Sequence, residues 1–377
     1  MIIHFKTKDM LEGLKKVEKI LPKNTSIEVL KYLKICSHEN EVVLMASDNN
    51  NSAEVKIPVD GENISVDKTG GVLLPKTFIE ILKKMGSSVS LTVNDSFEAT
   101  IKSTDVKIKA EMSLRGHDPE NYPNFPDIDG SPNLVLKGSE LSSAIVKTTF
   151  AVSDQEARPI LQGVQFQLKN GELIVTSTDS HRIARVYHAI NTKEDLGAGA
   201  VVPGKSLDEL KKIISDDENV EIIFTQSQFV ARTETITFYS RMIEGTYPDT
   251  SRILTDPSKA KLTFKANRSE MINALDRILV LVESSKRSVT TIQLNGQELL
   301  LENNKKDNGS AKESIFVTDI SGDSIKLSFD TLYVLQALQA TEAKMVTFCL
   351  NGEMAPFTIY PEDDTKNLNL VLPVKTY

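Results

Sequence analysis

The chain has 377 residues and a mass of 41.7 kDa, which predicts two to four domains rather than one core. Hydrophobic residues make up 40% and charged residues 25%, which excludes a disordered chain, and no apolar run approaches the roughly 20 residues that span a bilayer. The formal net charge of -8 argues against a protein that coats nucleic acid through its bulk charge.

Six segments have the apolar spacing of amphipathic helices, and they form two series. The first series is expected at residues 8–17, 139–147 and 269–277, and its second and third members begin with Ser-Glu, which suits a helix N-terminus. The second series is expected at residues 75–84, 203–212 and 331–338, with the same spacing between successive members. Pro75 and Pro203 begin its first two members, where the missing N–H costs no hydrogen bond.

Strand patterns repeat in nearly the same register. Alternating hairpins are expected at residues 89–103, 220–240 and 346–360, and Asn351-Gly352 is typical of a hairpin turn. Further strands are expected at residues 41–46 and 172–177, which are separated by almost the same interval as the helices. Together these elements predict an internal repeat of three α+β units, at residues 1–127, 128–254 and 255–377.

Four sequence motifs resemble those of one family. They are Arg158-Pro159-Ile160-Leu161-Gln162-Gly163-Val164, Thr178-Asp179-Ser180-His181-Arg182, the stretch at 240–249 that ends in Tyr247-Pro248-Asp249, and Leu372-Pro373-Val374-Lys375. With these motifs the whole chain resembles the bacterial sliding clamps, the beta subunits of DNA polymerase III. The resemblance implies an α+β fold of three repeated DNA-clamp domains, each with two helices packed on antiparallel sheets, which form half of a pseudo-sixfold ring.

The resemblance also implies a function. A homodimeric ring would encircle double-stranded DNA without reading its sequence and would tether the replicative DNA polymerase for processive replication, as a non-catalytic subunit of that holoenzyme. The implied partners are the alpha subunit of DNA polymerase III, the clamp loader, other polymerases and mismatch-repair proteins, which bind through short hydrophobic peptide motifs.

Basic residues on the predicted helices and turns are candidates for facing DNA. They are, with one glutamine, Lys15, Lys16, Lys23, Lys76, Lys83, Lys84, Lys147, Gln155, Arg158, Lys205 and Lys212. Lysine suits sliding because it attracts phosphate without a fixed geometry. The alternative is that these lysines are an ordinary solvated face. The third unit departs from the pattern: 331–338 contains no lysine, so its contribution to DNA contact must come from Arg268 and Arg277 or be small.

By the same resemblance, one pocket in each protomer accepts partner peptides. Its residues are Leu161, Thr178, Ser180, His181, Arg182, Ile183, Pro248, Arg252, Ile253, Asp330, Tyr333, Met354, Pro356, Val371, Leu372, Pro373 and Val374. An apolar lining with a few polar groups suits a peptide anchor. The alternative is that Leu161, Ile253 and Val371 belong to the core. Asp330 and Lys375 depart from the amide and the arginine that are commoner in the family.

The resemblance places the dimer interface as well. An edge strand around residues 107–110, with Ile108 and Ala110, would meet the third-unit helix of the second protomer near Val280 and Leu281. The run 278–282 is apolar on all sides, which is more than one buried helix face requires.

Two other function classes stay open: an enzyme that processes nucleic acid, and a clamp-like scaffold that does not encircle DNA. Residues 178–182 contain an acid, a nucleophile and a base, but a catalytic triad is assembled in space rather than in sequence. The five histidines lack metal-ligand spacing, and no Walker or Rossmann glycine motif is present, so we expect no catalytic residue, no metal and no other cofactor. The first residues lack a signal-peptide pattern and the two cysteines lie far apart, so we expect a cytoplasmic, nucleoid-associated protein without a membrane partner.

Overall fold

The structure is a computed structural model that describes residues 1–125, 128, 131–190, 195–197, 199–254, 256–281, 288–303, 309–362 and 364–375. Its internal contacts divide the chain into two compact units, residues 1–141 with 205–242 and residues 142–204 with 243–377. The predicted domain boundaries fall at residues 127 and 255, which lie outside the described residues.

The first unit contains two antiparallel sheets. The smaller sheet has the order β5-β1-β7-β8-β9, from β1 (Ile2–Lys6), β5 (Ile64–Lys68), β7 (Ser88–Val93), β8 (Glu98–Ser103) and β9 (Glu111–Arg115). The larger sheet has the order β10-β15-β16-β17-β4-β3-β2-β6, from β2 (Tyr32–Ser37), β3 (Glu41–Ser47), β4 (Asn51–Pro58), β6 (Gly70–Pro75), β10 (Leu134–Lys137), β15 (Asn219–Phe224), β16 (Gln228–Arg232) and β17 (Ile236–Arg241). Because β4 pairs with β17, segments that are far apart in the sequence lie side by side in this sheet.

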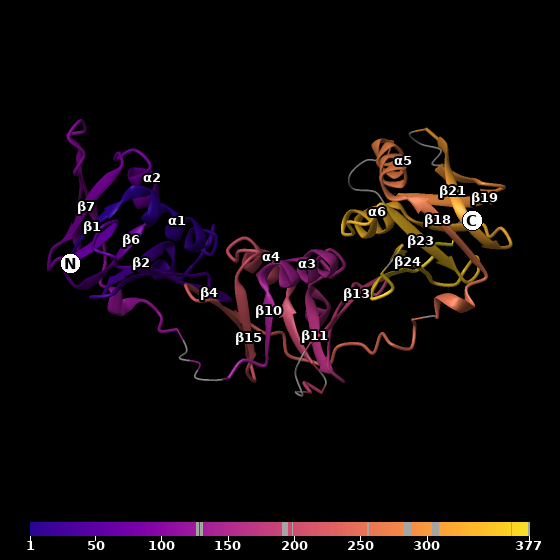
Figure 1. Ribbon diagram of the computed structural model, residues 1–377, viewed down its shortest axis with the longest axis horizontal. Coiled ribbons are helices and arrows are strands. Elements are labelled where there is room, and N and C mark those ends of the chain that lie inside the picture. The colour runs from indigo at the N-terminus through magenta and orange to yellow at the C-terminus, as the bar shows by residue number, and fades with distance from the viewer. Residues whose placement is uncertain are drawn as a thin grey trace. The chain divides into compact units, whose positions relative to one another are not determined.

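Two helices, α1 (Thr7–Glu18) and α2 (Thr77–Leu82), contact each other in the first unit (Figure 1). The apolar face of α1 buries Met10, Leu14 and Val17 and packs against β3 and β4. Gly13 permits a close approach, since a Cβ atom at this position would lie 2.8 Å from Ile57 Cδ1. The periodicity that predicted α1 is therefore the contact surface of the helix.

The second unit contains one long antiparallel arrangement of strands. Its order is β14-β11-β12-β13-β25-β24-β23-β18-β21-β20-β19-β22, from β11 (Gly163–Lys169), β12 (Glu172–Thr178), β13 (Arg182–Ala189), β14 (Ala200–Pro203), β18 (Leu262–Asn267), β19 (Val289–Asn295), β20 (Glu298–Asn303), β21 (Ala311–Gly322), β22 (Leu327–Asp330), β23 (Met345–Leu350), β24 (Phe357–Pro361) and β25 (Asn367–Val371). The pairing of β13 with β25 joins the middle and last thirds of the chain.

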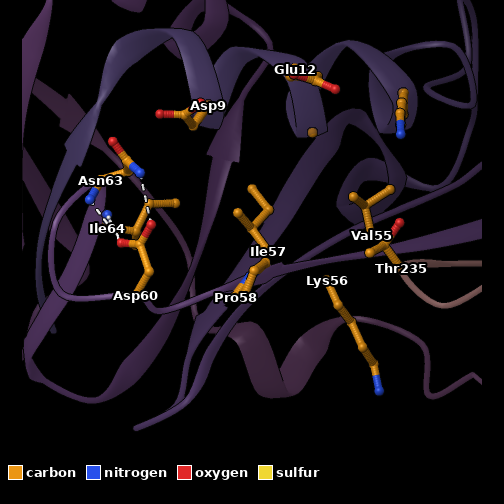
Figure 2. Close-up of a pocket in the computed structure, with 12 residues that line it drawn as sticks. Asp9, Glu12, Val55, Lys56, Ile57, Pro58, Asp60, Asn63, Ile64 and Thr235 are labelled. Atoms are coloured by element: carbon orange, nitrogen blue, oxygen red, sulfur yellow. Dashed lines mark hydrogen bonds between the residues drawn. The ribbon is translucent and has the colours of Figure 1, made fainter.

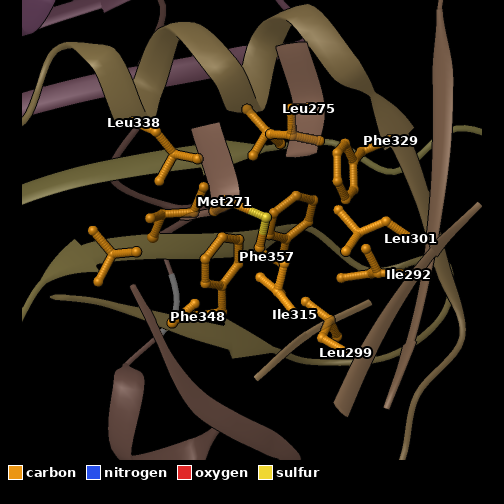
Figure 3. Packing of buried hydrophobic residues seen from close by; sticks show 14 of the residues in the cluster. Met271, Leu275, Ile292, Leu299, Leu301, Ile315, Phe329, Leu338, Phe348 and Phe357 are labelled. Atoms are coloured by element: carbon orange, nitrogen blue, oxygen red, sulfur yellow. The ribbon is translucent and has the colours of Figure 1, made fainter. Parts of the chain in front are cut away.

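Helices α5 (Arg268–Val280) and α6 (Thr331–Gln339) pack together on one side of the strands of this unit (Figure 1). Their apolar side chains, among them Met271 and Leu338, meet Phe348 and Phe357 from β23 and β24 (Figure 3). The Phe264 and Phe348 rings stack with centroids 5.0 Å apart. This core fixes α6 relative to β25, and both elements carry predicted site residues.

The six predicted helices are all present among the described residues; the remaining two, α3 (Gly138–Thr149) and α4 (Gly204–Lys211), belong to the middle repeat. The clamp architecture of helices on antiparallel sheets is confirmed. The prediction that Pro75 and Pro203 begin helices is wrong. Pro75 ends β6 opposite Tyr32, and Pro203 ends β14 opposite Gly163. A strand end also tolerates the missing N–H of proline, so the residue did not distinguish the two positions.

Three strand predictions need correction. The predicted hairpin at 220–240 is three strands, β15 to β17, and the turn at Asn351-Gly352 is part of a longer connection at 351–356. The predicted edge strand at 107–110 is wrong: the Ile108 amide bonds to the Asp105 carbonyl, 3.2 Å away, in a turn, and the edge strand is β9 at 111–115. Asp105 anchors this turn by accepting from the Ser87 hydroxyl at 2.7 Å.

Candidate functional site

The candidate site begins at the tight turn between β12 and β13. Asp179 Oδ1 accepts hydrogen bonds from the backbone amides of His181 and Arg182, at 2.8 and 3.0 Å. Ser180 has a φ of 78°, and the Thr178 hydroxyl donates to the Arg182 carbonyl at 2.6 Å. These bonds close the turn and leave Ser180 and His181 exposed at its tip.

The Arg182 side chain joins this turn to α6. It is 8% exposed, and its Nε donates to Asp179 Oδ2 at 2.9 Å while Nη2 donates to the Phe150 carbonyl at 2.6 Å. Its Nη1 donates to Gln336 Oε1, and the guanidinium lies 4.5 Å from the Tyr333 ring centroid. Because Arg182 is buried, is paired with Asp179 and donates from all three of its nitrogens, we infer that it positions Tyr333 rather than binding a ligand by charge.

The exposed His181 and the partly buried Tyr333 form the face of the site. Their rings stack with centroids 6.3 Å apart, although the two residues come from different repeats of the sequence. The Leu372 amide donates to the His181 carbonyl at 2.9 Å, and Arg158 Nη1 donates to Ser180 Oγ at 3.2 Å. We call the surface formed by these five residues the His181–Tyr333 surface.

The structure separates the predicted peptide-binding residues by burial. Leu161, Thr178, Arg182, Ile183, Asp330 and Val371 are buried; Tyr333, Pro356, Leu372, Pro373 and Val374 are partly buried; Ser180, His181, Pro248, Arg252, Ile253 and Met354 are exposed. Leu161 and Val371 thus belong to the core, while Ile253 does not, since 45% of it is exposed. Met354 is 59% exposed, in the connection between β23 and β24. A large exposed apolar side chain of this kind is typical of an interaction surface.

Two residues support this site by hydrogen bonds to the backbone. Asp330, which was predicted as a peptide-binding residue, caps α6, because its Oδ1 accepts from the Leu332 amide at 3.1 Å. Sequence reasoning missed the role of the second. Tyr247 is buried, and its hydroxyl accepts from the Thr178 amide at 3.0 Å and donates to the Gly163 carbonyl at 3.3 Å. An aspartate before a helical pattern is a visible capping signal, whereas no local signal marks the bond from Tyr247.

The triad interpretation of residues 178–182 is not supported by the geometry. The Asp179 carboxylate accepts from the backbone amide of His181 and from Arg182, whereas the His181 ring stacks on Tyr333. Ser180 Oγ accepts from Arg158. A catalytic triad instead needs a carboxylate on the histidine ring and that ring on the hydroxyl. Among the described residues, no group of three His, Cys, Asp or Glu side chains is arranged to hold a metal ion.

Some of the predicted DNA-facing lysines form ion pairs with glutamates of the same repeat, and others do not. Lys76 pairs with Glu18 at 2.9 Å, Lys83 with Glu80 at 2.7 Å, and Lys212 with Glu209 at 2.9 Å. The others, Lys15, Lys16, Lys23, Lys84, Lys147 and Lys205, make no ion pair with any residue that the structure describes, and Gln155 and Arg158 are exposed.

The two arginines expected to contribute from the third repeat, Arg268 and Arg277, are both engaged. Arg268 donates to the Leu338 carbonyl at 2.7 Å, and Arg277 forms a two-bond ion pair with Glu313. Glu313 offsets the charge of Arg277, while Arg268 keeps its charge but has its Nε held by the backbone.

One cavity lies next to the lysine-bearing helix α1. It has a volume of about 270 Å³ and is lined by α1, β4 and the loop around Asp60 (Figure 2). Asp60 Oδ1 accepts from the amides of Glu62, Asn63 and Ile64 at 2.7 to 3.0 Å. These hydrogen bonds hold the pKa of Asp60 well below its usual range, so the loop keeps a negative charge beside Lys16.

Comparisons with known proteins cover almost the whole chain. Models of the DNA polymerase III beta subunit match at residues 1–126 for the N-terminal domain, 135–249 for the central domain and 252–375 for the C-terminal domain. The beta sliding clamps of Staphylococcus epidermidis and Staphylococcus aureus are 36% and 35% identical over 365 and 366 residues, 95% of each chain. The crystal structure of the DNA polymerase sliding clamp from Bacillus subtilis, 31% identical, covers 100% of both chains with a TM-score of 0.93. No helix among the described residues is long and apolar enough to cross a membrane.

Proposed function

The chain belongs to the family of DNA polymerase III beta subunits, the beta sliding clamps, and from this premise we propose that it closes as a homodimeric ring around duplex DNA. The ring tethers DNA polymerase III to its template during replication. The protein is cytoplasmic and associates with the nucleoid. The match of three successive clamp domains along residues 1–375 carries the proposal. The family is a non-catalytic processivity subunit, so the chain contributes binding rather than chemistry.

Contact with DNA comes from the exposed lysines of the first two repeats. Lys15, Lys23 and Lys84 are exposed and make no ion pair in the described part of the chain, so their charge is available to phosphate. A flexible ammonium group attracts phosphate at many positions, which suits a protein that moves along the duplex. The acidic remainder of the chain, with its net charge of -8, repels DNA elsewhere.

Partner proteins bind at the His181–Tyr333 surface. The stacked rings and the partly buried Leu372 offer apolar contacts, and the backbone of the turn is held by hydrogen bonds to Asp179. A short extended peptide with apolar side chains fits this chemistry. The partners are the alpha subunit of the polymerase, the clamp loader, other polymerases and mismatch-repair proteins.

The dimer forms between β9 and the end of α5. β9 is the edge strand of its sheet and pairs, among the described strands, with β8 alone, so one row of its backbone groups is available. Val280 at the end of α5 is 83% exposed, and Ile108, Ala110 and Leu281 are partly exposed; Val282, the last residue of the apolar run, lies outside the described residues. Burial of these apolar side chains against a second copy stabilises a closed ring.

His181→Ala tests the peptide-binding part of the function. Loss of the ring that stacks on Tyr333 should shorten the products made by the polymerase on a primed circular template by about tenfold, since hot-spot aromatic contacts dominate peptide binding. The matched control is His38→Ala, which removes an exposed histidine from the first unit. Product lengths that His181→Ala leaves at the wild-type value would contradict this assignment.

A further inference from the structure

The turn that carries His181 has a structural copy in the first unit, at residues 48–51. Asp48 Oδ1 accepts from the backbone amides of Asn50 and Asn51 at 3.0 and 2.7 Å, as Asp179 does from the amides of His181 and Arg182. Asn49 has a φ of 84°, and the corresponding Ser180 has a φ of 78°. The two turns thus share the same hydrogen bonds and the same left-handed residue.

The surroundings of the two turns correspond as well. Asn51 lies opposite Ser240 in the pairing of β4 with β17, and Arg182 lies opposite Val371 in the pairing of β13 with β25. Arg182 follows Asn51 in the sequence by the same number of residues as Val371 follows Ser240. A 3-10 turn at Glu28–Lys31 buries Leu30, where the second unit has Pro159–Gln162 and buries Leu161. The strand register therefore brings equivalent segments together in each unit.

A buried tyrosine follows the same place in both repeats. Tyr122 precedes Pro123-Asn124, as Tyr247 precedes Pro248-Asp249. The Tyr247 hydroxyl accepts from the Thr178 amide at 3.0 Å, whereas the Tyr122 hydroxyl makes no hydrogen bond to the described residues. The two tyrosines therefore correspond in position and burial but not in hydrogen bonding.

At the first-unit turn this arrangement encloses a cavity of about 200 Å³. Leu30, Phe125 and Tyr239 supply apolar surface, and the Phe125 and Tyr239 rings lie 5.7 Å apart. Gln228 Oε1, also on the lining, is buried and accepts no hydrogen bond from the described residues. Arg241 is exposed at the same cavity and makes no ion pair within the described ranges. An exposed cation without an ion pair, beside an apolar floor, points to a ligand with an anion and an apolar group.

We propose that this cavity, which we call the Arg241 pocket, is a second peptide-binding site. It takes an extended segment of a partner protein that carries an aromatic or aliphatic side chain next to a carboxylate. The apolar side chain lies against Phe125 and Tyr239, and the carboxylate pairs with Arg241. The inference rests on the proposed function of the His181–Tyr333 surface, of which the Arg241 pocket is the repeat-related copy.

The two sites differ in their chemistry. Asn51 replaces the buried Arg182, and Arg241 occupies the place of Leu372, one residue beyond the matched strand pair. The Arg241 pocket therefore has an exposed positive charge where the His181–Tyr333 surface has an apolar side chain. We expect acidic peptides to prefer the Arg241 pocket, and this preference to weaken as salt is added.

Photo-crosslinking of the full-length protein tests the proposal. The probe is acetyl-benzoylphenylalanine-Asp-Glu-amide, competed with acetyl-Phe-Asp-Glu-amide, and mass spectrometry locates the crosslinked residues. We expect saturable crosslinks within 123–125 or 239–241, reduced about tenfold by Arg241→Glu through loss of a charge-assisted pair. The control Lys169→Glu reverses an exposed positive charge on β11, outside the pocket lining, and should leave them unchanged.

His181→Ala separates this proposal from the peptide site of the second unit. Crosslinks at the Arg241 pocket should persist in this variant, because His181 is exposed and is not among the residues that line that pocket. Crosslinks confined to residues around His181 and Tyr333 would overturn the second site and leave the proposed function intact. Crosslinks that do not saturate, or that Arg241→Glu leaves at wild-type strength, would overturn the second site as well.

Discussion

At the scale of single residues, Arg182 shows how a buried charge can organise a binding surface. Its guanidinium connects the turn after β12 to α6 through Asp179, Gln336 and the Tyr333 ring. The sequence singled out residues 178–182 as a family motif, and the structure shows that they form a turn, which Asp and Ser favour. Gln336 and Phe150 could not be predicted, because they reach Arg182 from distant positions in the chain.

Arg182→Ala should therefore destabilise the protein. We expect the free energy of unfolding to fall by about 3 kcal/mol, because the change leaves the Asp179 carboxylate, whose side chain is 11% exposed, without its cation. Urea unfolding followed by circular dichroism measures the difference. Arg232→Ala is the matched control, since it removes a half-exposed ion pair with Glu221 and should cost at most about 1 kcal/mol. Equal losses in the two variants would show that Arg182 is not the organising contact.

At the scale of elements, the hydrophobic period predicted the helices well and the strand ends less well. The six helices follow from apolar positions that meet a sheet, and this requirement is local to each segment. Strand boundaries depend on pairing with distant segments, which is why Pro75 and Pro203 belong to strands and why the edge strand is β9 rather than residues 107–110. The turn that replaces the predicted strand at 107–110 also depends on a distant segment, because Asp105 accepts a hydrogen bond from Ser87.

Gly13→Ala tests how closely α1 packs on its sheet. Alanine favours a helix, yet its Cβ would lie 2.8 Å from Ile57 Cδ1 and 3.0 Å from Leu44 Cδ1. We expect overpacking to prevail and to lower the free energy of unfolding by about 2 kcal/mol in urea denaturation. Glu12→Ala, an exposed neighbour on the same helix, should change it by less than about 0.5 kcal/mol. A Gly13→Ala variant more stable than the wild type would refute the close contact.

At the scale of the whole molecule, the net charge of -8 averages exposed lysines on the helices with an acidic remainder. This separation of charge could be predicted once the repeat was found, because lysines recur at equivalent helices of the first two repeats. The engagement of Arg268 and Arg277 by other protein groups could not be predicted, since Leu338 and Glu313 approach them only through the fold of the third repeat.

The proposed dimer makes a prediction about mass. Leu281→Asp places a charge at the end of α5 in the interface, where it would be buried without a partner, so the native mass should fall from twice 41.7 kDa to 41.7 kDa. Light scattering coupled to gel filtration gives the mass at micromolar concentration. Val135→Asp, a change at a half-exposed residue on β10, should remain a dimer. A dimeric Leu281→Asp variant would place the interface elsewhere.

Retention on circular DNA tests the central claim most directly. The protein is loaded by its clamp loader onto a nicked circular plasmid, separated by gel filtration in high salt, and the plasmid is then cut once. A ring held by topology should stay with the circle in salt that screens its lysine contacts, and should be lost when the DNA is linearised. Protein that salt removes from the intact circle, or that stays on the linear form, would contradict the account.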